Sequence, residues 1–292
     1  MQQQNPFTKV SLAITDLDHI ITNKGWSNQD ALAERRVLAT MSTNKLKIAV
    51  VGENRLANAI SSLFQSNPQV ELIDFKQMED QKVAVDVIFE TENLYLEKKR
   101  STLLKIEEIT SEKTLILTSV LGVTATEAAS WLAHSSRLVG YAFFATIQKG
   151  DLIEIAPALQ TDSSFIDQAI RCLTEVTEEI EVVQDEVGLV YPRILAMIIN
   201  EAVFALMERT ASVDDIDIAM KKGTNYPLGP FEWADEIGLD DVYAVLSGLQ
   251  GSLGEERYRP ASLLKKMVYA KWLGTGSERG FHLNSEKKEI LS

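Results

Sequence analysis

The first half of the chain alternates short apolar runs with stretches in which apolar residues recur at helical spacing. Helical spacing is found in Leu56–Phe64 and Leu94–Ile109. The apolar runs predict strands at Ile48–Val51, Val70–Phe75, Val85–Phe89, Thr114–Thr118, Leu138–Phe144, Leu152–Ala156 and Ile180–Val183. Strands that alternate with helices predict a parallel sheet covered on both faces, which is the doubly wound α/β class of fold.

After Asp185 the pattern changes to helices alone. Leu189–Glu208 is long and carries an apolar face made of Ile194, Met197, Ile198, Val203 and Leu206. Further helices are predicted at Val213–Lys221, Pro230–Ile237, Asp240–Leu249 and Ala261–Leu273. We therefore expect an α/β domain at 45–185 and an all-helical domain at 186–292. Residues 1–44 are interpreted as an N-terminal extension, either a non-catalytic addition or upstream start, or a partner-binding arm.

Composition and charge argue against several classes of function. The net charge is −13 over 292 residues, which argues against a nucleic-acid backbone as partner. The single cysteine, Cys172, excludes an intrachain disulfide and a cysteine metal cluster, and we expect it to lie in the core. No apolar run approaches the roughly 18 residues of a membrane span, and the N-terminus lacks a signal-peptide pattern. We predict a cytoplasmic protein with no metal site and no membrane partner.

The segment after the first predicted strand resembles a dinucleotide-binding loop with one key change. Such loops use glycines for the turn, for close approach of the pyrophosphate and for helix packing. Gly52 is present, and Ala57 is acceptable at the packing position. Asn54 replaces the middle glycine and places a side chain where a phosphate would approach, while Glu53 adds a negative charge that Arg55 could offset. The loop therefore predicts a Rossmann-like domain whose binding of NAD is weakened.

Asp74 follows the second predicted strand at the spacing expected of an acid that binds the ribose of a dinucleotide. The alternative is a solvated carboxylate at the end of a strand. We take Gly52, Asn54, Arg55 and Asp74 as the candidate cofactor-binding residues.

The helical half contains a specific segment, Gly223–Asp240, in which a turn with Tyr226-Pro227 and Gly229 leads into a helix that begins at Pro230. It closely resembles the C-terminal domain of the 3-hydroxyacyl-CoA dehydrogenases. Further matches in the same order are Arg193–Leu195, Ile199–Val203, Ala211–Asp217, Tyr258–Pro260, Leu263–Lys266 and Trp272–Gly274. The resemblance covers roughly Lys45 to Phe281. It implies an all-α dimerisation domain, hence a homodimer through the C-terminal helices, and a cleft for an acyl-CoA-like small molecule.

The same resemblance exposes missing chemistry in the first half. Oxidising an alcohol by hydride transfer needs a base for the hydroxyl proton, and a histidine held by a carboxylate suits this role near neutral pH. In the family that histidine begins a run resembling H-F-F-N-P, with a glutamate further along. Here Ala142 stands at the histidine position, followed by Phe143–Thr146, and Glu154 stands at the glutamate position. Glu154 is therefore expected to be a catalytic remnant without an imidazole to orient.

Other positions implied by the resemblance also differ. A family asparagine before Arg193 is replaced by Pro192, and the serine-rich substrate loop is the apolar Ser119–Gly122. A helical insertion that grips CoA is absent, since only Lys76–Ala84 joins the second and third strands.

Three hypotheses follow for the function. The chain is a degenerate homologue that keeps fold and dimer and acts as a structural, regulatory or binding protein. Alternatively, it is an NAD-dependent oxidoreductase with altered catalytic residues or substrate, or a binding protein for another nucleotide or acyl ligand. The physiological ligand is left open.

Overall fold

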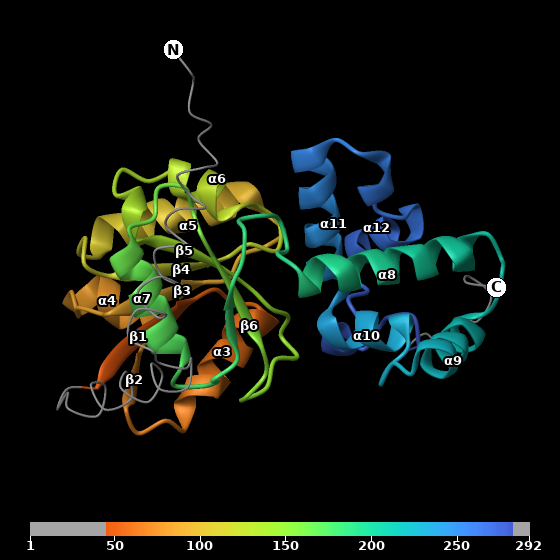
Figure 1. Cartoon of the computed structure of the whole chain (residues 1–292), viewed down its shortest axis with the longest axis horizontal. Coiled ribbons are helices and arrows are strands. Elements are labelled where there is room, and N and C mark those ends of the chain that lie inside the picture. The colour runs from red at the N-terminus through yellow and green to blue at the C-terminus, as the bar shows by residue number, and fades with distance from the viewer. Residues whose placement is uncertain (1–44, 283–292) are drawn as a thin grey trace, which may run out of the picture. The chain divides into compact units, whose positions relative to one another are not determined.

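The computed structural model describes residues 45–282, which form a seven-stranded sheet followed by helices (Figure 1). The strand order is β2-β1-β3-β4-β5-β6-β7. The strands are β1 Leu46–Val51, β2 Val70–Ile73, β3 Val87–Glu90, β4 Leu115–Ser119, β5 Leu138–Ala142, β6 Ile153–Pro157 and β7 Ile180–Val182. This confirms the predicted Rossmann-like α/β fold. The predicted extension at 1–44 lies outside the described residues.

One strand pair departs from the predicted parallel sheet, because β5 and β6 are antiparallel. The neighbouring pairs, from β2 to β5 and between β6 and β7, are parallel. The segment between Ala142 and Ile153 has no helix. A parallel return in one sheet needs a crossover of a dozen or more residues, usually helical, whereas a short connection reverses the chain.

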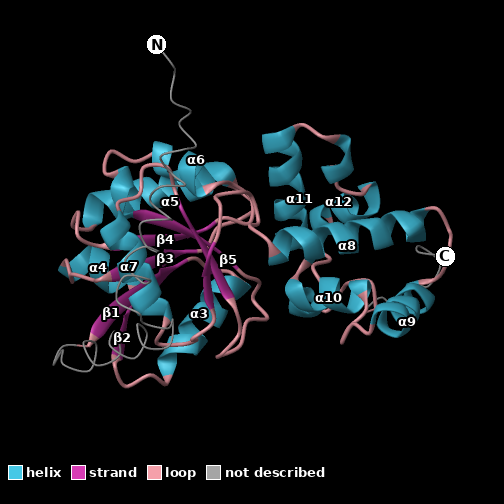
Figure 2. Cartoon of the chain, in the orientation of Figure 1, coloured by secondary structure: helices cyan, strands magenta, loops and turns pink. Residues whose placement is uncertain are grey.

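Helices cover both faces of the sheet, as Figure 2 shows. They are α3 Arg55–Gln65, α4 Phe75–Gln81, α5 Leu96–Ile109, α6 Ala125–Ser130 and α7 Ser163–Leu173. Successive strand residues point to opposite faces, so Tyr141 packs in the cluster with α3 and α7, and Ala142 packs in the cluster with α5 and α6. Cys172 on α7 is buried, as predicted, and burial raises the pKa of its thiol.

The remaining helices are α8 Tyr191–Met207, α9 Val213–Thr224, α10 Pro230–Ile237, α11 Leu239–Leu253 and α12 Ser262–Tyr269. The predicted apolar face of α8 is partly wrong, because Ile194 is 56% exposed whereas Leu195 and Ile199 are buried. Apolar residues lie around much of this helix, so periodicity alone does not identify the face that packs. In the described part of the chain, no helix combines the length and apolarity that a membrane crossing requires.

Candidate functional site

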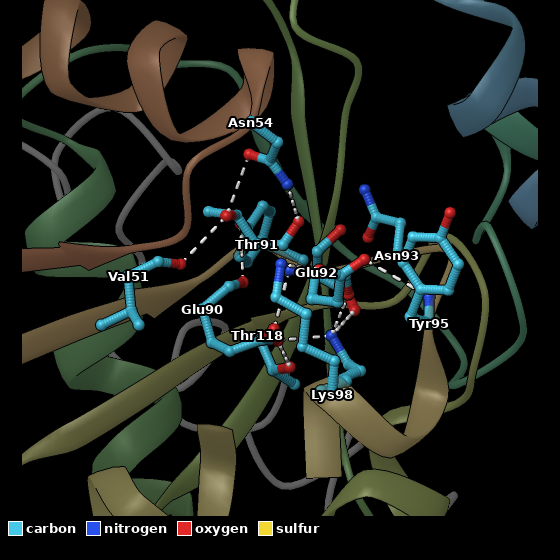
Figure 3. Close-up of polar contacts among 12 residues, drawn as sticks. Val51, Asn54, Glu90, Thr91, Glu92, Asn93, Tyr95, Lys98 and Thr118 are labelled. Carbon is cyan, nitrogen blue, oxygen red and sulfur yellow. Dashed lines mark hydrogen bonds and ion pairs between the residues drawn. The ribbon is translucent and has the colours of Figure 1, made fainter. Parts of the chain in front are cut away.

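The turn between β1 and α3 is closed by the side chain of Asn54 (Figure 3). Asn54 caps α3, because its Oδ1 accepts a hydrogen bond of 2.9 Å from the amide of Ala57. Its Nδ2 donates to the carbonyl of Thr91 at 2.6 Å, at the carboxyl end of β3. The free amides at a helix N-terminus are the groups that bind phosphates. In this loop one of those amides, that of Ala57, already donates to the side chain of Asn54.

Thr91 fills the space beside Gly52. Its hydroxyl lies 3.0 Å from the carbonyl of Val51 and 3.0 Å from Oδ1 of Asn54. A Cβ on Gly52 would overlap the Thr91 hydroxyl, and the φ of Gly52 is +143°, a conformation that favours glycine. Gly52 is therefore needed to pack against Thr91 whether or not a phosphate binds. Asn54 and Thr91 are hydrogen-bonded to each other at this turn, where a dinucleotide-binding loop has its middle glycine.

Arg55 and Asp74 do not join Asn54 around one anion. The guanidinium of Arg55 donates to the carbonyl of Glu236 and lies 3.4 Å from the hydroxyl of Thr275. Asp74 is exposed and caps α4 by accepting from the amide of Lys76 at 2.8 Å. The structure therefore brings Gly52 and Asn54 together in the turn, directs the Arg55 guanidinium toward Glu236 and Thr275, and leaves Asp74 apart at the end of β2.

A cavity of about 170 Å³ adjoins the loop, and we call it the polar cavity. Its lining is Asn54, Arg55, Glu92, Asn93, Leu94, Tyr95, Lys98, Asp240, Asp241, Val268, Lys271 and Leu273. The carboxylate of Glu92 accepts from Lys98 at 2.8 Å, and this hydrogen bond raises the pKa of Lys98. Acidic and basic side chains therefore face each other in this cavity. They were not predicted from the sequence, although Glu92 and Asn93 directly follow a strand at the edge where parallel sheets bind ligands.

Asp241 connects the sheet to α11 through the polar cavity. Its Oδ1 accepts a hydrogen bond of 2.9 Å from Nδ2 of Asn93. Burial, followed by the charge of the neighbouring Asp240, raises the pKa of Asp241 to about 7. Near neutral pH the carboxyl group of Asp241 is therefore partly protonated and partly ionised.

A buried ion pair holds the segment that carries Glu92. The ammonium of Lys99 pairs with the carboxylate of Glu90, and both side chains are almost fully buried. Lys99 also donates to the carbonyls of Glu92 at 2.9 Å and Ser119 at 2.7 Å, while the hydroxyl of Thr118 donates to Glu90 at 2.6 Å. The carboxyl ends of β3 and β4 are thereby fixed to α5.

Ala142 and Glu154 lie opposite each other on the antiparallel strands β5 and β6. The carboxylate of Glu154 is 5% exposed and accepts from the amides of Val190, at 2.9 Å, and Tyr191, at 3.0 Å. Glu154 thus caps the first turn of α8, where a carboxylate interacts favourably with the helix dipole. The predicted histidine and glutamate positions are therefore neighbours, but the residue opposite Glu154 is Ala142, whose side chain is only a methyl group.

A second cavity, of about 330 Å³, opens beside Ala142, and we call it the aromatic cavity. Its lining is Ala142, Phe143, Phe144, Thr146, Ile147, Asp151, Leu152, Glu154 and Tyr191. The rings of Phe144 and Tyr191 meet edge to face at 6.3 Å, and burial raises the pKa of Tyr191. Tyr191 and Asp151 were not predicted, because neither belongs to a sequence motif.

The loop after β4 is packed inside the chain. Val120 and Leu121 are fully buried, and Gly248 of α11 lies so close to Gly122 that a Cβ on Gly248 would overlap the Gly122 carbonyl. Pro192 is also buried, in the first turn of α8. These positions therefore contact the protein interior. Within residues 45–282, no group of three His, Cys, Asp or Glu side chains is placed to hold a metal.

Comparison with known proteins finds two family models in succession along the chain. Residues 29–186 match the family model of the 3-hydroxyacyl-CoA dehydrogenase NAD binding domain, and residues 188–283 match that of the 3-hydroxyacyl-CoA dehydrogenase C-terminal domain. The 3-hydroxybutyryl-CoA dehydrogenase of Bradyrhizobium diazoefficiens is 28% identical over 248 residues, which are 84% of this chain and 81% of the relative. A probable 3-hydroxybutyryl-CoA dehydrogenase of Deinococcus radiodurans is 30% identical over 213 residues, which are 72% and 74% of the two chains.

Solved structures of similar proteins have the same fold. The (S)-3-hydroxybutyryl-CoA dehydrogenase PaaH1 of Ralstonia eutropha gives a TM-score of 0.65 at 25% identity over 82% of this chain and 98% of that chain. FadB2 of M. tuberculosis gives a TM-score of 0.71 at 19% identity over 82% and 99%, a likeness of fold alone.

Proposed function

We propose that this chain, which belongs to the 3-hydroxyacyl-CoA dehydrogenase family, has kept the family fold and lost its hydride-transfer chemistry. It then acts in the cytoplasm as a structural, regulatory or binding homologue. The family's NAD-binding domain is present, but we propose that its affinity for NAD is weakened.

The observation that carries this proposal is the pairing of Ala142 with Glu154. Removing the hydroxyl proton of a substrate requires a base within hydrogen-bond reach. Ala142 offers no such group, and the carboxylate of Glu154 has a structural use, since it caps α8 through the amides of Val190 and Tyr191. A carboxylate that caps a helix has a structural reason to persist after the catalytic partner is gone.

The cofactor loop supports the same proposal. Asn54 uses an α3 amide that an anion would need, and Thr91 fills the turn beside Gly52. A pyrophosphate would have to displace the hydrogen bonds between Asn54 and Thr91 before it could bind. Displacing intact hydrogen bonds subtracts from the affinity of any ligand.

We also propose a homodimer through the C-terminal helices. Val190 and Ile194 are about half exposed at the start of α8. An exposed apolar group of this kind favours a protein partner. An acyl-CoA-like small molecule is the second proposed partner, through family membership.

One observation favours the alternative of an altered NAD-dependent oxidoreductase. The polar cavity places Glu92, Lys98 and Asp241 beside the cofactor loop. Ionisable groups with shifted pKa values in a cleft, here Lys98 and Asp241, are candidates for catalysis. This alternative requires that one of them accept the substrate proton in place of the missing imidazole.

The test is turnover of 3-hydroxybutyryl-CoA, the substrate in the relatives' names, with NAD. We expect no NADH above the buffer background, with the Clostridioides difficile dehydrogenase as the positive control. Ala142→His should be equally inactive, because the cofactor loop and Pro192 are unchanged. Strong turnover would refute the proposal, and it would establish the alternative if Glu92→Gln or Asp241→Asn abolished it.

The dimer is tested separately by light scattering. We expect twice the chain mass, and Ile194→Glu should shift the protein towards the monomer by placing a charge in the apolar surface. A wild-type monomer at micromolar concentration would refute this part of the proposal.

A further inference from the structure

We propose that the aromatic cavity is a binding site for a small organic cation with an aromatic body, such as an arylalkylamine. This inference goes beyond the proposed function. It depends on that function in one respect, which is that the small side chain of Ala142 leaves the space open. The ligand is defined by the shape and charge of the lining residues.

The walls of the cavity favour a flat, apolar body. Phe144 and Tyr191 provide two ring surfaces at 67° to each other, and Ile147 and Leu152 complete the lining. Aromatic rings favour offset or edge-to-face contact with another ring. The volume of about 330 Å³ lies at the lower end of the range of small-molecule sites.

The charge of the lining favours a cation. Glu154 and Asp151 contribute carboxyl groups, whereas no Lys, Arg or His lines the cavity. Glu154 is almost fully buried, so solvent screens its charge less than that of a surface carboxylate. A bound ammonium group would also interact favourably with the face of an aromatic ring.

Glu154 can accept a further hydrogen bond. Its oxygens accept from Val190 and Tyr191, and a carboxylate has about four lone-pair sites. Oδ2 of Asp151 accepts from the amide of Gln148 at 2.8 Å and likewise retains capacity. An N–H donor that enters the cavity therefore has two acceptors, one buried at the inner end and one exposed at the rim.

The cavity is accessible from the surface. Leu152, Thr146 and Tyr191 are exposed at its rim, while Ala142 and Glu154 lie at its inner end. The aromatic body would contact the apolar rim, and the ammonium group would point inward to Glu154. None of these residues lines the polar cavity, so binding does not require NAD.

The test is calorimetric titration of the full chain with three probes that share a phenyl ring: phenethylamine, 2-phenylethanol and 3-phenylpropionate. We expect phenethylamine to bind about tenfold more tightly than the alcohol, since the ion pair and cation–π contact are lost in the neutral probe. The carboxylate probe should show no binding. Equal affinity for amine and alcohol would refute the charge argument, and no binding of any probe at millimolar concentration would refute the site.

Variants locate the binding. Ala142→Leu should fill the cavity and abolish binding of both amine and alcohol. Asp151→Asn, an exposed change at the rim that tests the site even if Ala142→Leu does not fold, should weaken only the amine. Glu108→Gln, an exposed change of the same charge on α5, should leave all affinities unchanged.

The outcome is independent of the dehydrogenase assay. Amine binding that persists unchanged in the presence of NADH is expected, whatever the turnover of 3-hydroxybutyryl-CoA. Competition between phenethylamine and NADH would instead place the amine in the cofactor cleft and refute this assignment.

Discussion

Two aspartates of the helical region, Asp217, which is buried, and Asp241, which is partly buried, show how differently the same side chain can be used. Asp217 accepts hydrogen bonds from the amides of Phe231, at 2.8 Å, and Glu232, at 3.1 Å, and so fixes the start of α10. Asp241 lines the polar cavity, where its carboxylate accepts from the side chain of Asn93. The carboxylate of Asp217 accepts from backbone amides, whereas Asp241 is partly buried beside another acid, Asp240.

The difference extends to the motifs around these residues. The segment Gly223–Asp240, which carries the family resemblance, is held by Asp217 and by Asp235, which accepts from the amides of Phe281 and His282. At the carboxyl edge of the sheet, the departures at Asn54 and Ala142 lie where a ligand would bind. Under the proposed function, residues that satisfy the backbone have been kept, and residues that would touch cofactor or substrate have been replaced.

The first prediction concerns Asp217, whose carboxylate accepts from two backbone amides. Asp217→Ala should lower the free energy of unfolding by about 3 kcal/mol, because two buried amides lose their acceptor. Urea unfolding measures this effect. Asp214→Ala, an exposed change on the same helix, should cost less than about 0.5 kcal/mol. Equal losses in the two variants would remove the distinction drawn for Asp217.

The second prediction has the opposite sign. Asp241→Asn should stabilise the protein at pH 8 by on the order of 2 kcal/mol, while changing little at pH 4. Burial and Asp240 raise the folded pKa of Asp241 to about 7, above about 3.9 in the unfolded chain. The folded state therefore binds more protons across this window, and wild-type stability falls as pH rises through it.

The measurement for Asp241 is urea unfolding as a function of pH. The variant should have a flatter pH profile than the wild type, because asparagine can still accept from Asn93 but does not ionise. Asp80→Asn, an exposed change on α4, should leave the profile unaltered. A variant that is less stable than the wild type at pH 8 would show that favourable interactions outweigh the cost of burying the Asp241 charge.

The third prediction separates a helix cap from a catalytic remnant. Glu154→Ala should destabilise the protein by about 1–2 kcal/mol, since the amides of Val190 and Tyr191 lose their acceptor at the start of α8. Glu154→Gln keeps an acceptor oxygen and should lose less. Thermal unfolding of both variants measures the difference, and no loss in Glu154→Ala would leave Glu154 without a structural role.

Strands and helices were predictable because their apolar residues recur with the period of each element. The direction of β6 was missed, because an antiparallel strand and a parallel strand have the same alternation of buried side chains, and only the short connection from β5 indicates the reversal. The exposure of Ile194 was not predictable either, because apolar residues lie on several faces of α8. Periodicity identifies an element but does not state which neighbour covers it.

The candidate site was predictable only as far as local motifs reach. The sequence placed Asn54 at the phosphate position, but its partner Thr91 lies 37 residues further on. The contact between Asn93 and Asp241 joins residues 148 positions apart, and neither belongs to a glycine loop. Contacts of this kind depend on how strand ends and helices meet in the folded chain.

The last prediction tests the closed cofactor loop. Asn54→Gly should tighten NADH binding by about tenfold, or ~1.4 kcal/mol, because it frees the amide of Ala57 and removes the bond to Thr91. Thr91→Ala should add to the effect by opening the space beside Gly52. Asp74→Asn is the matched comparison: asparagine keeps the α4 cap, so a loss of NADH affinity would assign Asp74 to the ribose. Fluorescence titration of NADH measures all three, and wild-type binding as tight as that of Asn54→Gly would show that this loop does not weaken the cofactor site.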